Sequence, residues 1–166
     1  MAPVVSERSA LVLTVSDGAA AGQRDDASGR ALAARLVELG FNVTRKTVPD
    51  EVEEIDLAVS VAAESVDLVV ATGGTGLGPR DRTPQALHGL LDYEIAGFGE
   101  VMRVAGRLST PLADLSRSLG GVLGRTLVVA VPGSTGGAME SLAAIEPLLD
   151  HALETLHGHT QHKGAE

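Results

Sequence analysis

The residues whose types are best suited to binding or catalysis lie in one run, Thr72-Gly73-Gly74-Thr75-Gly76-Leu77-Gly78-Pro79-Arg80-Asp81-Arg82-Thr83-Pro84. Four of the seven positions from 72 to 78 are glycine, so the backbone there can turn sharply and bring N–H groups close to an anion. Arg80 offers a planar fork that matches phosphate oxygens, and Asp81 could hold Mg²⁺ or orient a water or ligand group. Thr83 is a candidate N-cap and Pro84 a first helical residue, which would point the positive end of the next helix at the loop. The run predicts a phosphate cradle; the alternatives are a glycine-rich connection without a ligand and, for Asp81, a solvated turn.

This glycine run fits neither of two common nucleotide-binding motifs. It is not a Walker loop because no Gly-Lys-Ser/Thr follows, and Thr75 and Gly78 break the Gly-x-Gly-x-x-Gly fingerprint. No acidic residue clearly follows at the position that would contact a ribose. NAD binding is therefore disfavoured.

Further polar residues stand where expected strands end. Ser16-Asp17 follows the first strand, and Ser134 follows Pro132-Gly133 after the last strand. Both are candidate ligand contacts, because crevices in α/β sheets lie at the carboxyl ends of strands, and both could equally be turn residues. Asp50 and Glu53 have the spacing of a capping box, and this spacing alone favours a helix cap for Asp50.

Hydrophobic patterning predicts the elements that would position these residues. Apolar or alternating runs predict strands at 10–15, 41–48, 68–71 and 126–131. Apolar spacings of three and four predict five helices. The first begins after Ser28 as N-cap and ends before Gly40, and the second covers 52–62 after Pro49-Asp50. The others run from Pro84 through Leu91, over 97–108, and from after Gly133 to Leu156, and a loop is expected at 19–26. Right-handed crossovers between parallel strands then predict an α/β fold, three-layer and doubly wound, with a mostly parallel sheet, helices on both faces and a crevice at the strands' carboxyl ends.

Length and composition limit the possible functions. The formal net charge of −9 over 166 residues argues against nucleic acid or an anionic membrane as the main partner. The lack of cysteine excludes a disulfide framework, a thiolate zinc site and a cysteine nucleophile. No signal peptide or membrane-spanning run is recognisable, so we expect a cytoplasmic protein. We expect one domain at 10–157 with a short extension at 1–9 and a flexible tail at 158–166; for His157, His159 and His162 a frayed end is favoured over a metal site.

Several of these pieces occur together, in order, in a known family. They are Leu13-Thr-Val-Ser-Asp17, Asp26-Ala-Ser-Gly29, Pro49-Asp-Glu51, Thr72-Gly-Gly-Thr-Gly76, Arg80-Asp-Arg-Thr-Pro84, Leu115-Ser-Arg117 and Pro132-Gly-Ser134 with Glu140. From about Ala10 to Leu156 the chain resembles the molybdopterin adenylyltransferases, the MogA and MoaB group that includes the G domain of gephyrin.

The resemblance implies a fold, an assembly and a reaction. Such proteins have the MogA-like α/β fold, form homotrimers, and use Mg²⁺ and ATP to adenylylate the terminal phosphate of molybdopterin, with release of pyrophosphate, before a downstream protein inserts molybdenum. By motif position, Asp81 matches the family's essential aspartate and a Mg²⁺ contact, and Asp50 matches a second important aspartate, which reverses the preference for a cap. The implied ligand contacts are Ser16, Asp17, Thr72, Gly73, Gly74, Thr75, Gly76, Arg80, Thr83, Pro132, Gly133, Ser134 and Glu140.

The chain also departs from the family pattern. Arg82 replaces an apolar residue, and Thr135-Gly136 stands where gephyrin-like members carry two lysines, whereas Arg80-Asp81 and Thr83-Pro84 are kept as in active members. The run Pro132-Gly-Ser-Thr-Gly-Gly137 is more MoaB-like. Two alternatives therefore stay open: a catalytically silent MoaB-type carrier that binds molybdopterin, and a nucleotide enzyme like the competence-damage-type domain that acts on pyridine nucleotides or ADP-ribose.

Overall fold

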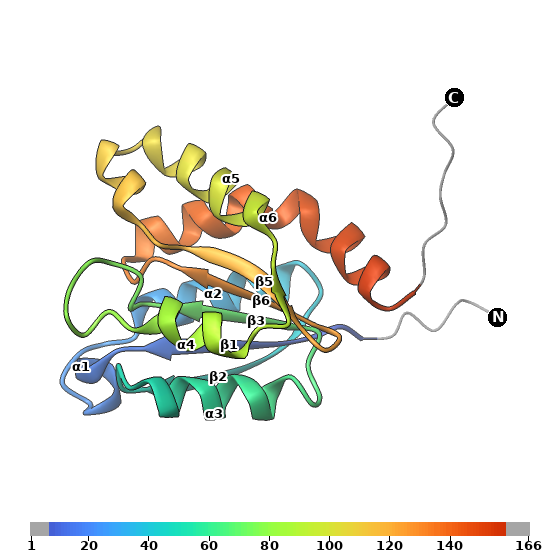
Figure 1. The fold of residues 1–166 in the computed structure, drawn as a ribbon, viewed down its shortest axis with the longest axis horizontal. Coiled ribbons are helices and arrows are strands. Elements are labelled where there is room, and N and C mark those ends of the chain that lie inside the picture. Colours follow the sequence, from blue (N-terminus) through green and yellow to red (C-terminus); the bar gives the residue numbers. More distant parts are fainter. Residues whose placement is uncertain (1–6, 159–166) are drawn as a thin grey trace.

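A six-stranded sheet between two layers of helices makes up the part of the chain that the computed structural model describes, residues 7–158 (Figure 1). The strands are β1 (Ser9–Val15), β2 (Asn42–Val48), β3 (Leu68–Thr72), β4 (Tyr93–Glu94), β5 (Leu119–Leu123) and β6 (Thr126–Val131). The helices are α1 (Asp17–Ala20), α2 (Ala27–Glu38), α3 (Val52–Ala62), α4 (Thr83–Leu90), α5 (Ala96–Arg107), the 3₁₀ helix η1 (Pro111–Leu115) and α6 (Thr135–Leu156).

The strand order is β2-β1-β3-β6-β5-β4, and the first four of these strands run parallel. β5 and β4 extend the sheet as an antiparallel edge. Thr14 pairs with Thr72 and Thr72 pairs with Val131, so β1, β3 and β6 end side by side. The predicted three-layer, mostly parallel α/β fold is confirmed, and its three central strands deliver their connecting loops to one edge.

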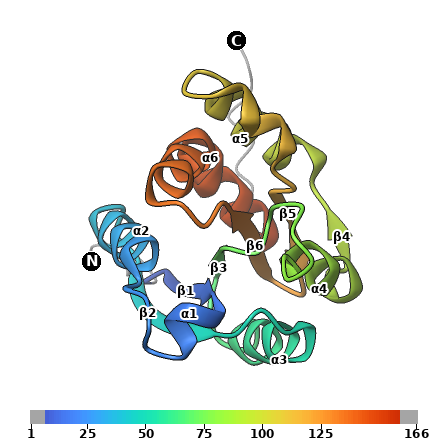
Figure 2. The same cartoon turned by 90° about the vertical axis from the view of Figure 1, so that its left-hand side faces the viewer.

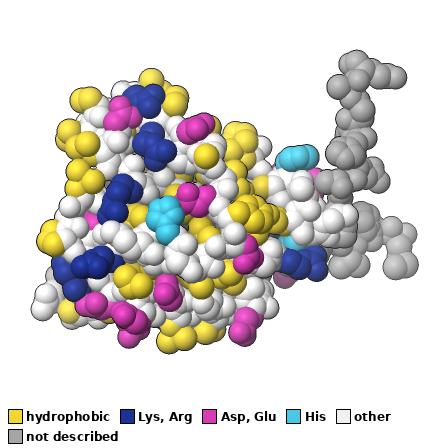
Figure 3. All heavy atoms as spheres, in the orientation of Figure 1, with side chains coloured by type: hydrophobic (Ala, Val, Ile, Leu, Met, Phe, Trp, Pro, Cys, Tyr) yellow, Lys and Arg dark blue, Asp and Glu magenta, His cyan; other side chains and the backbone are white. Residues whose placement is uncertain are grey.

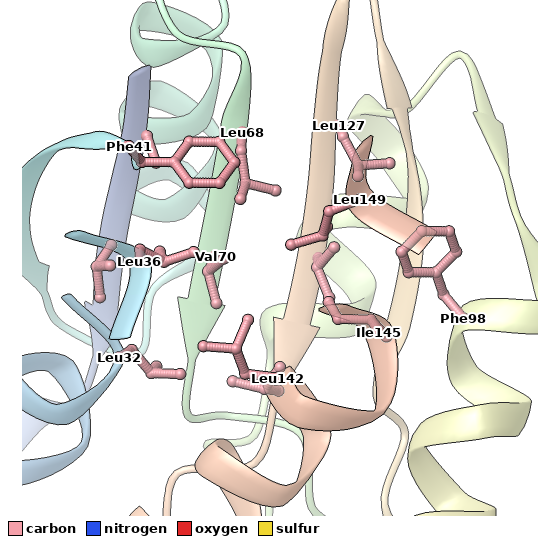
Figure 4. Packing of buried hydrophobic residues seen from close by; sticks show 14 of the residues in the cluster. Leu32, Leu36, Phe41, Leu68, Val70, Phe98, Leu127, Leu142, Ile145 and Leu149 are labelled. Carbon is pink, nitrogen blue, oxygen red and sulfur yellow. The ribbon is translucent and has the colours of Figure 1, made fainter. Parts of the chain in front are cut away.

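Each central strand is buried on both faces, and its side chains alternate between two cores. In β6, Val129 belongs to a core that α2, α5 and α6 cover, whereas Val128 belongs to a core that α3 and α4 cover. Figure 2 shows these helix layers on opposite faces of the sheet. In Figure 4, Leu142 and Ile145 of α6 pack beside Val70 of β3. Burial on both faces explains why these strands read as continuous apolar runs.

The structure differs from the prediction at several ends and connections. Asp26, not Ser28, caps α2, because its Oδ1 accepts a hydrogen bond from the N–H of Gly29 at 2.9 Å. Ser28 is instead buried inside the first turn, where its Oγ lies 3.3 Å from Thr72 Oγ1. Part of the expected 19–26 loop forms the single-turn helix α1, whose N-cap is Ser16. The antiparallel strands β4 and β5 and the helix η1 were not expected.

The surface and the chain ends bear on the remaining expectations. No helix among residues 7–158 is long and apolar enough to cross a membrane. On the face shown in Figure 3, acidic side chains gather along the lower edge over α3, and basic ones are spread apart.

Ser9, expected in the extension, begins β1, and His157 contacts Asp67 with Nε2 3.3 Å from Oδ1. The other two tail histidines lie outside the described residues, and the expected domain bounds stay a prediction.

Candidate functional site

A cleft of about 640 Å³ opens where β1, β3 and β6 end, which is the edge that the sequence predicts for a crevice. Its wall combines the glycine loop after β3, the connections after β1 and β2, and the start of α6. The lining residues are Thr14, Val15, Ser16, Ala19, Arg24, Asp25, Asp26, Ala27, Ser28, Asp50, Thr72, Gly73, Gly74, Thr75, Gly76, Asp81, Gly133, Ser134 and Thr135. The structure thus brings most of the predicted site residues to one place.

The glycine loop presents a series of free backbone donors. Within residues 7–158, the N–H groups of Gly74, Thr75, Gly76 and Leu77 have no hydrogen-bond acceptor. Gly73 adopts φ 105°, and a Cβ there would lie 2.2 Å from the carbonyl oxygen of Val15. Successive unpaired N–H groups form a concave site that suits an anion. The loop has the features of the predicted phosphate cradle.

Thr83 holds this loop through a buried hydrogen bond and does not cap α4. Its side chain is fully buried, and its Oγ1 donates to the carbonyl of Gly73 at 2.8 Å. The N-cap of α4 is Arg82, which makes no capping bond, so the expected cap at Thr83 is wrong. α6 contributes its N-terminus to the cleft instead: Ser134 and Thr135 line it, and Ser134 caps the helix by accepting from Gly137 at 3.2 Å. A helix N-terminus adds favourable potential for an anion there.

Asp50 faces the cleft and does not form the capping box that its spacing suggests. The N-cap of α3 is Glu51, without a side-chain bond. Asp50 Oδ2 accepts from the N–H of Asp17 at 2.8 Å, and Asp17 Oδ1 accepts from the N–H of Asp50 at 3.0 Å. Burial raises the pKa of Asp50 above its ordinary value, and the nearby carboxylates of Asp17 and Asp81 also raise it. This reciprocal pair ties the end of β1 to the end of β2.

Arg80 lies outside the lining, with its guanidinium engaged by two carboxylates. Its Nε and Nη2 donate to the two oxygens of Asp17 at 3.1 and 3.0 Å, and Nη2 also lies 2.8 Å from Glu51 Oε1. The bond from Arg80 holds the pKa of Asp17 below its usual value. In this arrangement the fork of Arg80 stabilises the Asp17–Asp50 pair. The phosphate contact that the sequence predicts for Arg80 stays a prediction.

Asp81 closes the glycine loop and shares the cleft with Asp50. Its Oδ2 accepts from the N–H of Gly78 at 2.8 Å. No group of three or more His, Cys, Asp or Glu side chains among the described residues is placed to hold a metal by itself. Mg²⁺ commonly binds through one or two carboxylates plus substrate phosphates, so Asp50 and Asp81 fit a site that the ligand would complete.

Two predicted residues, Pro132 and Glu140, lie beside the cleft, and Thr72 in its wall holds one of them. Thr72 Oγ1 donates to the carbonyl of Pro132 at 2.8 Å, which joins the ends of β3 and β6. Pro132 and Glu140 line an adjoining cavity of about 200 Å³, which meets the cleft at Ser134. Glu140 accepts a hydrogen bond from Ser109. The structure therefore places Glu140 next to the cleft and not in it.

The sequence reasoning missed the cleft wall between α1 and α2. Asp26 is held by Thr14 Oγ1 at 2.8 Å and by Arg45 at 2.6 Å. Burial opposes ionisation of Asp26, but the bonds from Arg45, Thr14 and the N–H of Gly29 outweigh it and lower its pKa. Arg24 is the basic side chain among the described lining residues. The motif Asp26-Ala-Ser-Gly29 marked part of this wall, but nothing in the spacing of Arg24 pointed to the cleft.

Comparison with known proteins places this geometry in a family context. Residues 11–151 match the profile of a family described as "Probable molybdopterin binding domain". A molybdenum cofactor biosynthesis bifunctional protein of Synechococcus elongatus is 43% identical over 151 residues, which cover 90% of this chain and 47% of that protein. A molybdopterin adenylyltransferase of Helicobacter pylori is 34% identical over 152 residues, which cover 89% of this chain and 86% of that protein.

The fold matches solved structures over nearly their full length. The crystal structure of the molybdopterin biosynthesis enzyme MoaB from Thermus thermophilus superposes with a TM-score of 0.83 at 45% identity, and the match covers 91% of this chain and 97% of that one. The chain spans about half the length of the bifunctional relative, 47%, but most of the Helicobacter pylori protein, 86%.

Proposed function

Because this chain belongs to the molybdopterin-binding family, we propose that it is a molybdopterin adenylyltransferase that uses Mg-ATP. The observation that carries the proposal is the meeting of two aspartates, Asp50 and Asp81, with the free N–H groups of the glycine loop in one cleft. Such a cleft suits a reaction between phosphate groups, which needs positioning and charge stabilisation more than a covalent protein intermediate.

The proposed reaction joins two anions. An oxygen of the terminal phosphate of molybdopterin forms a bond to the α-phosphorus of ATP, the bond from that phosphorus to the bridging oxygen breaks, and pyrophosphate leaves with the electron pair. Bound Mg²⁺ would supply positive charge that offsets the repulsion between the reactants. Asp50 and Asp81 would hold it, while the free N–H groups of the glycine loop bind phosphate oxygens and fix their orientation.

The direct test is pyrophosphate release and adenylyl-molybdopterin formation by purified protein with molybdopterin and MgATP. We expect Asp81→Asn to lower the rate by at least about 10²-fold while the protein stays folded, because Asn keeps the shape of the side chain and loses the charge. Asp150→Asn is the matched control, because Asp150 is 82% exposed at its side chain and pairs with Arg8 outside the cleft. Wild-type turnover in Asp81→Asn would contradict the assigned role.

A second function, a carrier that binds molybdopterin without turnover, is favoured by the charge of the cleft wall. The lining includes the carboxylates of Asp25, Asp26, Asp50 and Asp81 against the single basic side chain of Arg24 among the described residues. Such a wall opposes the triphosphate of ATP, which carries more negative charge, more strongly than the single terminal phosphate of molybdopterin. Pterin binding without pyrophosphate release would favour this carrier over the enzyme.

The same proposal includes the setting in which the protein acts. We propose that it works in the cytoplasm as a homotrimer and passes its product to a protein that inserts molybdenum. Size measurement in solution and capture of the product by a partner would test these two points.

A further inference from the structure

Arg117 contacts the glycine loop from a distant part of the chain. It lies between η1 and β5, and its Nε and Nη2 donate to the carbonyl of Gly76 at 3.0 and 2.7 Å. Nη2 also donates to the carbonyl of Asp81 at 2.8 Å, and the backbone N–H of Arg117 donates to the carbonyl of Thr75 at 2.9 Å. One residue therefore joins both ends of the segment from Thr75 to Asp81.

These contacts determine which way the loop donors point. In a trans peptide the C=O and the following N–H point in opposite directions. The carbonyls of Thr75 and Gly76 face Arg117, so the N–H groups of Gly76 and Leu77 are turned away from it. Both N–H groups lack an acceptor within residues 7–158. Gly76 lines the cleft and Leu77 follows it directly in the chain, whereas Arg117 is not among the described lining residues.

We propose that Arg117 is a positioning residue that aims the N–H groups of Gly76 and Leu77 at a phosphate group of the bound ligand and fixes the backbone at Asp81. This inference rests on the proposed function, because it takes the loop to be a phosphate site. The phosphate is that of ATP or the terminal phosphate of molybdopterin. The two sources share the same chemistry and are separated by experiment.

The contacts of Arg117 with the loop are not needed to anchor the segment between η1 and β5. Arg103 already holds that segment by donating to the carbonyl of Ser118 at 3.0 Å, and Arg107 holds η1 through Asp114 Oδ1 at 2.6 Å. Within residues 7–158 no carboxylate pairs with Arg117. Its charge and planar fork are directed at the loop carbonyls, a geometry that Lys cannot reproduce.

The experiment compares wild type, Arg117→Ala, Arg117→Lys and the control Arg107→Ala by calorimetric titration with MgATP and, separately, with molybdopterin. We expect Arg117→Ala to weaken binding of the ligand whose phosphate occupies the loop by about 10- to 100-fold, because the carbonyls of Gly76 and Asp81 lose their side-chain donor and the N–H of Leu77 is no longer held in one direction, while the backbone bond to Thr75 is kept. Binding of the other ligand should change by less than about twofold, as should both ligands in Arg107→Ala. Arg117→Lys should stay impaired, because it keeps the charge but loses the fork.

Rescue by guanidinium separates positioning from general loosening. Arg117 lines a cavity of about 260 Å³ that shares no described lining residue with the cleft, so the space left in Arg117→Ala is open to a small cation. We expect guanidinium chloride at tens of millimolar to restore binding to Arg117→Ala, and urea at the same concentration to restore none.

The outcomes distinguish this inference from the proposed function. Wild-type affinity for both ligands in folded Arg117→Ala, or full recovery in Arg117→Lys, would overturn the role of Arg117 even if the wild type makes product. Weakened and rescuable binding in a protein that makes no product would uphold Arg117 and overturn the adenylyltransferase.

Discussion

Ionisation of Asp50 is costly in the folded state. Burial raises its pKa above the ordinary value of 3.8, and the negative charges of Asp17 and Asp81 add to the effect. The folded protein therefore binds a proton at Asp50 at higher pH than the unfolded chain does. The destabilising contribution is present above the folded pKa and disappears as the pH falls below 3.8.

We predict that Asp50→Asn unfolds at a higher temperature than wild type at neutral pH, with the gain lost in acid. Asn keeps a carbonyl oxygen that can accept the N–H of Asp17, and it removes the charge that burial opposes. Thermal unfolding across pH measures the difference. We expect transfer activity to be lost in the same variant, which is the usual conflict between a strained site and stability.

Asp17→Asn is a control for which we expect the opposite change in stability at neutral pH. The bond from Arg80 lowers the pKa of Asp17, so its ionised form stabilises the fold above 3.8 and that contribution is lost as the pH falls through the folded pKa. Asp17→Asn should lower the unfolding temperature at neutral pH. If Asp50→Asn is also less stable than wild type there, burial is not the dominant influence on its carboxylate.

Sequence spacing could nominate these residues but could not assign their contacts. Asp50 and Thr83 have the side chains and positions of helix caps, and both turn toward the loops that connect to neighbouring strands. A cap depends on local sequence, whereas these contacts depend on which strand ends lie side by side. The motif resemblance pointed to Asp50 because it carries information about the assembled site.

At the scale of elements, the site depends on how closely β1 and β3 approach at their ends. Gly73 combines φ 105° with a position where a Cβ would lie 2.2 Å from the carbonyl oxygen of Val15. We predict that Gly73→Ala lowers the free energy of unfolding by more than about 2 kcal/mol, because strain and collision add. Denaturant unfolding measures the loss.

Two other glycines separate the effect of backbone strain from that of the collision with Val15. Gly40 has φ 90° with open space around it, so Gly40→Ala should cost only the backbone strain, about 1–2 kcal/mol. Gly136 lies in α6 with open space and without a positive φ, so Gly136→Ala should cost nothing. Equal losses at Gly73 and Gly40 would show that the close approach to Val15 is unimportant.

The sequence predicted the strands whose residues form apolar or alternating runs, and it missed β5, which is buried but contains two glycines. β3 and β6 are wholly buried and stood out as apolar runs. β5 contains Gly120 and Gly121, which weaken a strand pattern, yet a Cβ at Gly120 would lie 2.7 Å from Phe98 and one at Gly121 would lie 2.5 Å from the carbonyl of Tyr93. Their small size serves tertiary packing, which a local pattern does not reveal.

At the scale of the molecule, the cleft is assembled from segments that are far apart in the chain. Arg117 holds a loop that is far away in the sequence: Gly76 is 41 positions and Asp81 is 36 positions before it. Single-sequence patterns extend over one helix or strand, so these contacts could not be predicted from them. The glycine loop could be, because its chemistry is contained in consecutive residues.

The proposed homotrimer gives the last prediction. Exposed apolar side chains occur at the end of α5 and on η1: Leu108, the C-cap of α5, is 90% exposed, and Leu112 on η1 is 68% exposed. A large exposed apolar patch commonly marks an interface. We predict that wild type has the mass of a trimer by light scattering and that the double variant Leu108→Lys with Leu112→Lys is monomeric. Leu57→Lys on α3, where Leu57 is 59% exposed, should remain a trimer.

The same double variant tests whether the cleft is complete within one chain. The described lining residues of the cleft come from the loops and helix ends of a single chain, and neither Leu108 nor Leu112 is among them. Leu112 does line the adjoining cavity, which meets the cleft at Ser134. We expect the monomeric variant to bind MgATP within about twofold of wild type, because both substitutions leave the described lining residues of the cleft unchanged. A trimer that persists in the double variant would place the interface elsewhere, whereas a monomer that loses MgATP binding would mean that a neighbouring subunit completes the site.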